Sequence, residues 1–102
     1  MIKATEMAKM VKQHSNEIIE SASLHFDDFF IRHMKETLIV KGGYMSVDAG
    51  NFLCYLRKKQ PFNTLHDAGI IKRFVSELQE SGYIAEHVCP SMNPDYISVK
   101  VP

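Results

Sequence analysis

The sequence is poor in residues that build covalent or metal frameworks. It contains only two cysteines, Cys54 and Cys89, and they do not form a Cys-x-x-Cys pair. This spacing gives neither a zinc motif nor a disulfide framework, so we expect two reduced thiols in a cytoplasmic protein. Phosphate-binding glycine loops and nucleophile-elbow motifs are also missing. We therefore predict that the chain is not an enzyme and needs no cofactor.

An excess of charge of one sign is lacking as well. Lys and Arg number 12 and Asp and Glu number 12, so the formal net charge is zero. This balance does not indicate a strongly basic nucleic-acid binder, although a local basic patch remains an alternative. Apolar runs are only a few residues long, so none is expected to span a membrane. The first residues also lack the apolar core of a signal peptide.

The remaining composition is that of one folded domain. Hydrophobic residues make up 45% and charged residues 24% of a chain of 102 residues. These values are typical of globular proteins, and this length supports a core without disulfides. We predict a single domain over residues 1–102, with a long or broken helix over residues 3–41 and a compact β-α-α-β-β unit over residues 44–101.

The last third of the chain has the clearest pattern. Apolar residues recur at helical spacing from Leu65 to Leu78, and Thr64 and Asp67 are placed as in a capping box. Gly82 then suits a left-handed C-terminal cap. The predicted elements are a helix over residues 64–81 and strands over residues 83–88 and 96–101.

Alternation assigns the inward positions of these two strands. Ile97, Val99 and Val101 alternate with polar residues and are predicted to face the core. In the preceding strand, Ile84 and Val88 are predicted to share that inner face. The loop between the strands runs from residue 89 to residue 95.

The first part of the chain predicts a helix of unusual length. Apolar residues recur at spacings of three and four from Met7 to Met34, and no proline interrupts them. An unbroken helix of about 38 residues would be about 57 Å long, which is more than one small domain can cover. Either the helix breaks near Ser21–Ser23, or part of its apolar stripe packs on another chain, as in a homodimer through the N-terminal helix.

The middle of the chain completes the predicted order. Residues 44–48 predict a short strand, Asp48 suits an N-cap for a helix over residues 49–60, and Pro61 stops that helix. The order is therefore α-β-α-α-β-β. We predict an α+β fold with a long N-terminal helix, two further helices and a small three-stranded antiparallel sheet.

No metal or catalytic site is predicted. His14, His25 and His33 each precede an acid by three residues, but a helix spreads them over about 30 Å of its axis, so one chain cannot gather them round an ion. Cys54 is expected to pack in the core. Cys89 lies two residues from His87, but nothing supplies an oxyanion hole.

Two surface sets are candidates for macromolecular contacts. Basic residues would contact phosphates if the chain bound nucleic acid, and aromatic residues are frequent anchors of protein interfaces. The nucleic-acid candidates are Arg57, Lys58, Lys59, His66, Lys72 and Arg73. The protein-interface candidates are Phe29, Phe30, Tyr55 and Tyr83.

The segment Ile70-Ile-Lys-Arg-Phe-Val-Ser-Glu-Leu-Gln-Glu-Ser-Gly-Tyr-Ile84, followed by a hairpin, resembles the winged-helix fold. This resemblance covers about 60 residues. It implies that residues 65–81 form a recognition helix and that His66, Lys72 and Arg73 face DNA. The long preceding segment, a hairpin loop that is not basic and the zero net charge depart from that pattern.

The whole chain also resembles small uncharacterised proteins encoded by tailed phages. Three groups of short motifs carry the resemblance: Ile2-Lys-Ala-Thr-Glu-Met7, Lys41-Gly-Gly-Tyr-Met-Ser-Val47, and Leu78-Gln-Glu-Ser-Gly-Tyr83 with Tyr96-Ile-Ser-Val99. It implies an accessory protein of the host cytoplasm that binds and modulates a host protein, and it assigns no active-site residue. We expect a non-enzymatic protein-binding module, with a winged-helix DNA-binding regulator as the alternative.

Overall fold

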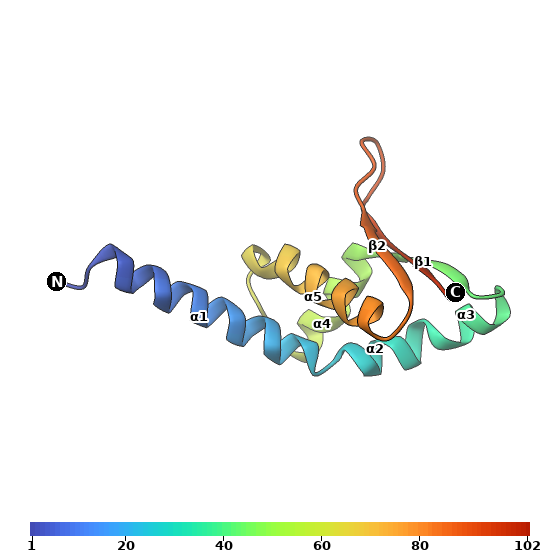
Figure 1. Ribbon diagram of the computed structural model, residues 1–102, viewed down its shortest axis with the longest axis horizontal. Coiled ribbons are helices and arrows are strands. Elements are labelled where there is room, and N and C mark those ends of the chain that lie inside the picture. The colour runs from blue at the N-terminus through green and yellow to red at the C-terminus, as the bar shows by residue number, and fades with distance from the viewer.

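The computed structural model describes residues 1–102 as an α+β arrangement of helices and one small sheet (Figure 1). The predicted class and element order are confirmed. The helices are α1 Ala4–Ser23, α2 Phe26–His33, α3 Lys35–Val40, α4 Ala49–Lys59 and α5 Asp67–Glu80, with a 3₁₀ turn η1 Thr64–His66 before α5. The strands are β1 Tyr44–Asp48, β2 Ile84–Val88 and β3 Tyr96–Lys100.

The long N-terminal helix breaks near Ser21–Ser23, which is one of the two alternatives predicted from the sequence. α1 ends at Ser23, whose hydroxyl donates to the carbonyl of Glu20 at 2.7 Å. A serine hydroxyl that bonds the backbone in this way favours bends over continued helix. A second break at Met34 separates α2 from α3 and places that side chain, which is fully buried, in the core. The two bends allow α2 and α3 to pack against the rest of the domain, although α1 extends beyond it.

The three strands form one antiparallel sheet in the order β1-β3-β2. Val47 pairs with Ile97, and Ala85 pairs with Val99, and all four side chains are buried on the face that meets the helices. Residues two apart on a strand share a face. The inner face of the central strand β3 is therefore set by Ile97 and Val99, as predicted. The same prediction is wrong for Val101, which follows the end of β3 and is 43% exposed.

The predicted inner face of β2 is wrong by one residue. Ala85 is buried, whereas Ile84 is 57% exposed. The turn before the strand explains the shift, because it places Tyr83 against the domain. A shift of one residue exchanges the two faces of a strand. His87, and not Val88, therefore points to the side of the sheet that carries the core.

The core is centred on an aromatic cluster between the helices. The rings of Phe52 and Phe74 stack with centroids 4.4 Å apart, and Phe26 and Phe29 contact both of them. All four rings are at most 4% exposed. Their packing joins α2, α4 and α5 into one unit.

Of the two predictions made for the N-terminal ends of helices, one is confirmed and one is wrong. Asp48 accepts a hydrogen bond from the amide of Asn51 at 2.9 Å, so it caps α4 as predicted. Thr64 and Asp67 do not form the predicted capping box. Asn63 instead accepts from the amide of Leu65 at 2.9 Å, because a short asparagine side chain reaches an amide two residues on. The 3₁₀ turn thus begins the helical segment, and Leu65 is 85% exposed.

The end of α5 forms the predicted glycine cap. Gly82 has φ +97°, the amide of Gly82 donates to the carbonyl of Gln79, and the amide of Tyr83 donates to that of Leu78. These two bonds are those of a Schellman motif, in which a left-handed residue follows the helix.

Replacing Gly82 by valine is expected to lower the free energy of unfolding by at least about 1 kcal/mol. A β-branched residue is strained at positive φ. Urea unfolding followed by circular dichroism measures the change. Gly82→Asn is the matched control, because asparagine tolerates the left-handed region and should be milder. Equal stability of Gly82→Val and the native chain would contradict the assignment of a left-handed cap.

The molecule is elongated because α1 extends beyond the domain. Its principal dimensions are 58 × 30 × 25 Å, and its radius of gyration is 15.4 Å, compared with about 13 Å for a compact domain of 100 residues. Figure 1 shows the N-terminal half of α1 pointing away from the other elements. None of the helices combines the length and apolar character needed to cross a membrane.

Candidate functional site

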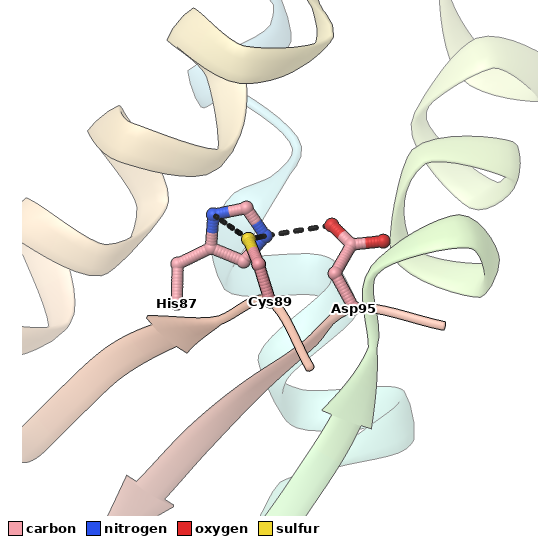
Figure 2. A group of neighbouring side chains, drawn as sticks. All are labelled: His87, Cys89 and Asp95. Atoms are coloured by element: carbon pink, nitrogen blue, oxygen red, sulfur yellow. Dashed lines mark hydrogen bonds and ion pairs between the residues drawn. The ribbon is translucent and has the colours of Figure 1, made fainter. Parts of the chain in front are cut away.

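The β2–β3 hairpin gathers three side chains with donor atoms at one end of the sheet (Figure 2). Val88 pairs with Tyr96, so the register continued by one residue sets Cys89 opposite Asp95. His87 lies two residues before Cys89 and shares its face. Asp95 is therefore the diagonal neighbour of His87, within reach of a long side chain.

The distances within this cluster, called the hairpin cluster below, are short. Nε2 of His87 lies 2.6 Å from Oδ2 of Asp95. Sγ of Cys89 lies 3.7 Å from Nε2 and 4.0 Å from Nδ1 of the same ring. The three donor atoms all lie within 4.8 Å of one another. The His87 and Asp95 side chains are 30% and 44% exposed, so the cluster is open to solvent.

The geometry of the hairpin cluster is not that of a catalytic triad. In a triad, one imidazole nitrogen faces the nucleophile and the other faces the orienting carboxylate. Here Nε2 of His87 faces Asp95 and is also the nitrogen nearer to Cys89. A proton cannot pass across the ring from the thiol in this arrangement. Imidazole, thiolate and carboxylate are, however, the three donor types that zinc accepts.

Sequence reasoning paired Cys89 with His87 but missed Asp95. The missing signal was the hairpin register. With a loop over residues 90–94, positions 89 and 95 face each other, which follows from the two predicted strands once their pairing is fixed. The predicted inner face also pointed His87 to the wrong side of the sheet.

Most of the predicted nucleic-acid contacts are engaged within the chain. Arg57 pairs with Asp67, donates to the Phe62 carbonyl at 3.2 Å and lies over the Phe62 ring. Arg73 donates to both carboxylate oxygens of Glu20 at 2.9 Å. This pairing with α1 is the main reason that the pKa of Arg73 is raised.

The other four basic candidates differ in whether they have a partner within the chain. Lys59 lies 4.0 Å from Asp28, and the His66 ring meets the His14 ring edge-on with centroids 6.2 Å apart. Lys58 on α4 and Lys72 on α5 are exposed and form no ion pair. Of the six predicted contacts, only these two lysines offer a free positive charge to a partner.

The four aromatic interface candidates fall into three different environments. Phe29 is 4% exposed and belongs to the core, so the structure does not present it to a partner. Its position on α2 aims it at the aromatic cluster, and helical periodicity cannot distinguish such a ring from one at the edge. Phe30 and Tyr83 are half-buried, with ring centroids 5.4 Å apart, and line a groove beside α5.

Tyr55 is committed to a contact inside the chain. Its hydroxyl donates to Asp28, and Arg32 donates to the same carboxylate at 2.9 Å. The hydrogen bond from Tyr55, followed by that from Arg32, lowers the pKa of Asp28. The same bond raises the pKa of Tyr55. These side chains tie α4 to α2 and leave little of the hydroxyl for a partner.

An unpartnered apolar feature lies on the N-terminal half of α1. Ala4, Met7, Ala8 and Val11 follow one face of the exposed N-terminal half, and we call these four residues the α1 stripe. Met7 and Val11 are 43% and 61% exposed. The same face continues toward the C-terminal end of α1 and becomes buried there. Its continuation is formed by Ser15, Ile18, Ile19 and Ala22, which are half-buried or buried.

Within the domain, α1 packs on α5 and η1 through this continuation. Gly69 of α5 permits the close approach, because a Cβ there would lie 2.7 Å from Cδ1 of Ile19. The α1 stripe is thus the free half of a face whose other half already serves as a packing surface.

No protein-family model, curated protein or solved structure matches the chain.

Proposed function

We propose that the chain is a non-enzymatic protein-binding module of the phage accessory type, and that it forms a homodimer through α1. The observation that carries the proposal is the α1 stripe, which continues a packing face into solvent over about two helical turns. Apolar stripes of this spacing are typical of helices that pack on a partner. Binding of a host protein is the further role that the phage resemblance implies.

A second copy of the chain fits the α1 stripe better than an unrelated surface. A two-fold dimer presents the same stripe from both copies, so the two faces match by construction. Ala4 and Ala8 allow two helix backbones to approach closely. An isolated helix end of this length is also marginal in water, so a partner helix would stabilise it.

The mass in solution tests the proposal. Light scattering across a dilution series is expected to give twice the chain mass of 11.7 kDa at high concentration and a shift toward that mass on dilution. A tagged chain should also retain one stoichiometric protein from bacterial lysate after nuclease treatment if it modulates a host protein. A strictly monomeric mass at all concentrations would refute the homodimer.

The connectivity of the sheet favours one alternative function. One strand, two helices and a hairpin in the sheet order β1-β3-β2 agree with the winged-helix resemblance, which would make α5 a recognition helix. The charges support it less. The hairpin loop between Val88 and Tyr96 contains no Lys or Arg, and Arg73 is paired with α1.

We expect no saturable binding of the chain to duplex DNA at physiological salt, because the formal net charge is zero and, of the six predicted nucleic-acid contacts, only Lys58 and Lys72 are free to contact phosphates. Fluorescence anisotropy with a labelled duplex measures this directly, and a low-salt titration shows any nonspecific attraction. Salt-dependent binding that disappears when Lys58 and Lys72 are both replaced by alanine would instead support the winged-helix regulator.

A further inference from the structure

The hairpin cluster has the donor set of a zinc site. His87 supplies an imidazole nitrogen, Cys89 a sulfur and Asp95 a carboxylate oxygen, and zinc binds all three types. A thiolate selects against Mg²⁺ and Ca²⁺, which prefer oxygen ligands. The side chains belong to two strand ends that the sheet holds in register, so their positions do not depend on a mobile chain terminus.

The spacing between the nitrogen and sulfur donors is close to that of tetrahedral coordination. Zinc–nitrogen bonds of about 2.0 Å and zinc–sulfur bonds of about 2.3 Å place nitrogen and sulfur about 3.5 Å apart at a tetrahedral angle. Nε2 of His87 and Sγ of Cys89 lie 3.7 Å apart. Nitrogen and oxygen ligands would be about 3.3 Å apart, against 2.6 Å for the hydrogen bond between His87 and Asp95. A small rotation of the half-exposed Asp95 side chain makes up this difference.

A metal ion would also cross-link the two ends of the hairpin loop. The backbone of residues 90–94 forms none of the backbone–backbone hydrogen bonds found in the turns and loops. The loop also contains Pro90 and Pro94. Its two ends, Cys89 and Asp95, are the residues that the ion would join. Closing a loop of this kind restrains the hairpin in the way that other cross-links do.

We propose that His87, Cys89 and Asp95 bind one Zn²⁺ per chain and that the ion closes the β2–β3 loop. Three protein ligands leave the fourth position to water, as in open zinc sites. The site lies on the hairpin and not on α1, so it is independent of the proposed homodimer. A chain that does not bind zinc can still be tested for dimerisation, and a chain that does not dimerise can still be tested for zinc binding.

Calorimetric titration of the reduced full-length chain with Zn²⁺ tests the site. One ion per chain is expected to bind. Cys89→Ser or His87→Ala should weaken the dissociation constant by at least about 100-fold, since even partners of metal ligands contribute 10- to 100-fold. Cys54→Ser is the matched control, because Cys54 is the other thiol and lies exposed on α4, so the prediction that it packs in the core is wrong. It should leave the dissociation constant unchanged.

Titration with Co²⁺ gives a second measurement that reports the sulfur ligand. Thiolate-to-cobalt absorption is expected in the native chain and in Cys54→Ser, and it should be missing in Cys89→Ser. Circular dichroism without metal confirms that each variant is folded. The proposal is overturned by the absence of saturable Zn²⁺ binding, by binding that survives Cys89→Ser, or by one ion per two chains, which would place the ion between copies.

Discussion

Replacing Phe52 by alanine is expected to lower the free energy of unfolding by about 3–5 kcal/mol. Phe52 is fully buried on α4, and its ring stacks on Phe74 and meets Phe26 and Phe29. Truncation removes the transfer free energy of the ring and leaves a cavity between three rigid rings that cannot close round it. For a chain of 102 residues, this is a large share of a total stability of about 5–15 kcal/mol.

Equilibrium unfolding in urea, followed by far-ultraviolet circular dichroism, measures this loss. Ile31→Ala is the control, because Ile31 is 61% exposed on α2 and its truncation should change the free energy of unfolding by less than about 0.5 kcal/mol. Phe52→Leu should lie between the two, since it retains part of the apolar volume. A loss below about 1 kcal/mol for Phe52→Ala would mean that the aromatic cluster is not the centre of the core.

Local signals predicted the elements well because each has a local cause. The cap at Asp48, the left-handed turn at Gly82 and the stop before Pro61 all depend on residues within one or two turns. Alternation also identified the inward side of β3. The break near Ser21–Ser23 was one of two alternatives, and periodicity alone could not choose between them because the apolar stripe continues through the break.

The features that the sequence did not predict depend on contacts between residues that are far apart in the chain. The inner face of β2 depends on the turn that places Tyr83 against the domain. The prediction for this face was shifted by one residue, and it therefore put His87 on the opposite side of the sheet from Asp95. Arg73 is paired with Glu20, which is 53 residues away, and no spacing rule connects such positions. Phe29 and Phe30 are neighbours with equal hydrophobicity, yet the direction of α2 buries only Phe29 fully.

Replacing Val11 by glutamate is expected to weaken the homodimer by at least about 100-fold in dissociation constant. Val11 is the last residue of the α1 stripe and is 61% exposed in the single chain. A two-fold dimer would bury the introduced carboxylate twice, and an unpaired buried charge costs about 3–5 kcal/mol. The fold of the monomer should be unaffected, because the site is exposed and glutamate has a higher helix propensity than valine.

Sedimentation velocity across a dilution series measures the dissociation constant. Gln13→Glu is the matched control, because it adds the same charge to α1 two residues away, on the side that does not carry the α1 stripe. If dimerisation responded to net charge alone, both variants would weaken it equally. A selective effect of Val11→Glu would place the α1 stripe in the interface. An unchanged dimer in Val11→Glu would mean that the copies associate through another surface.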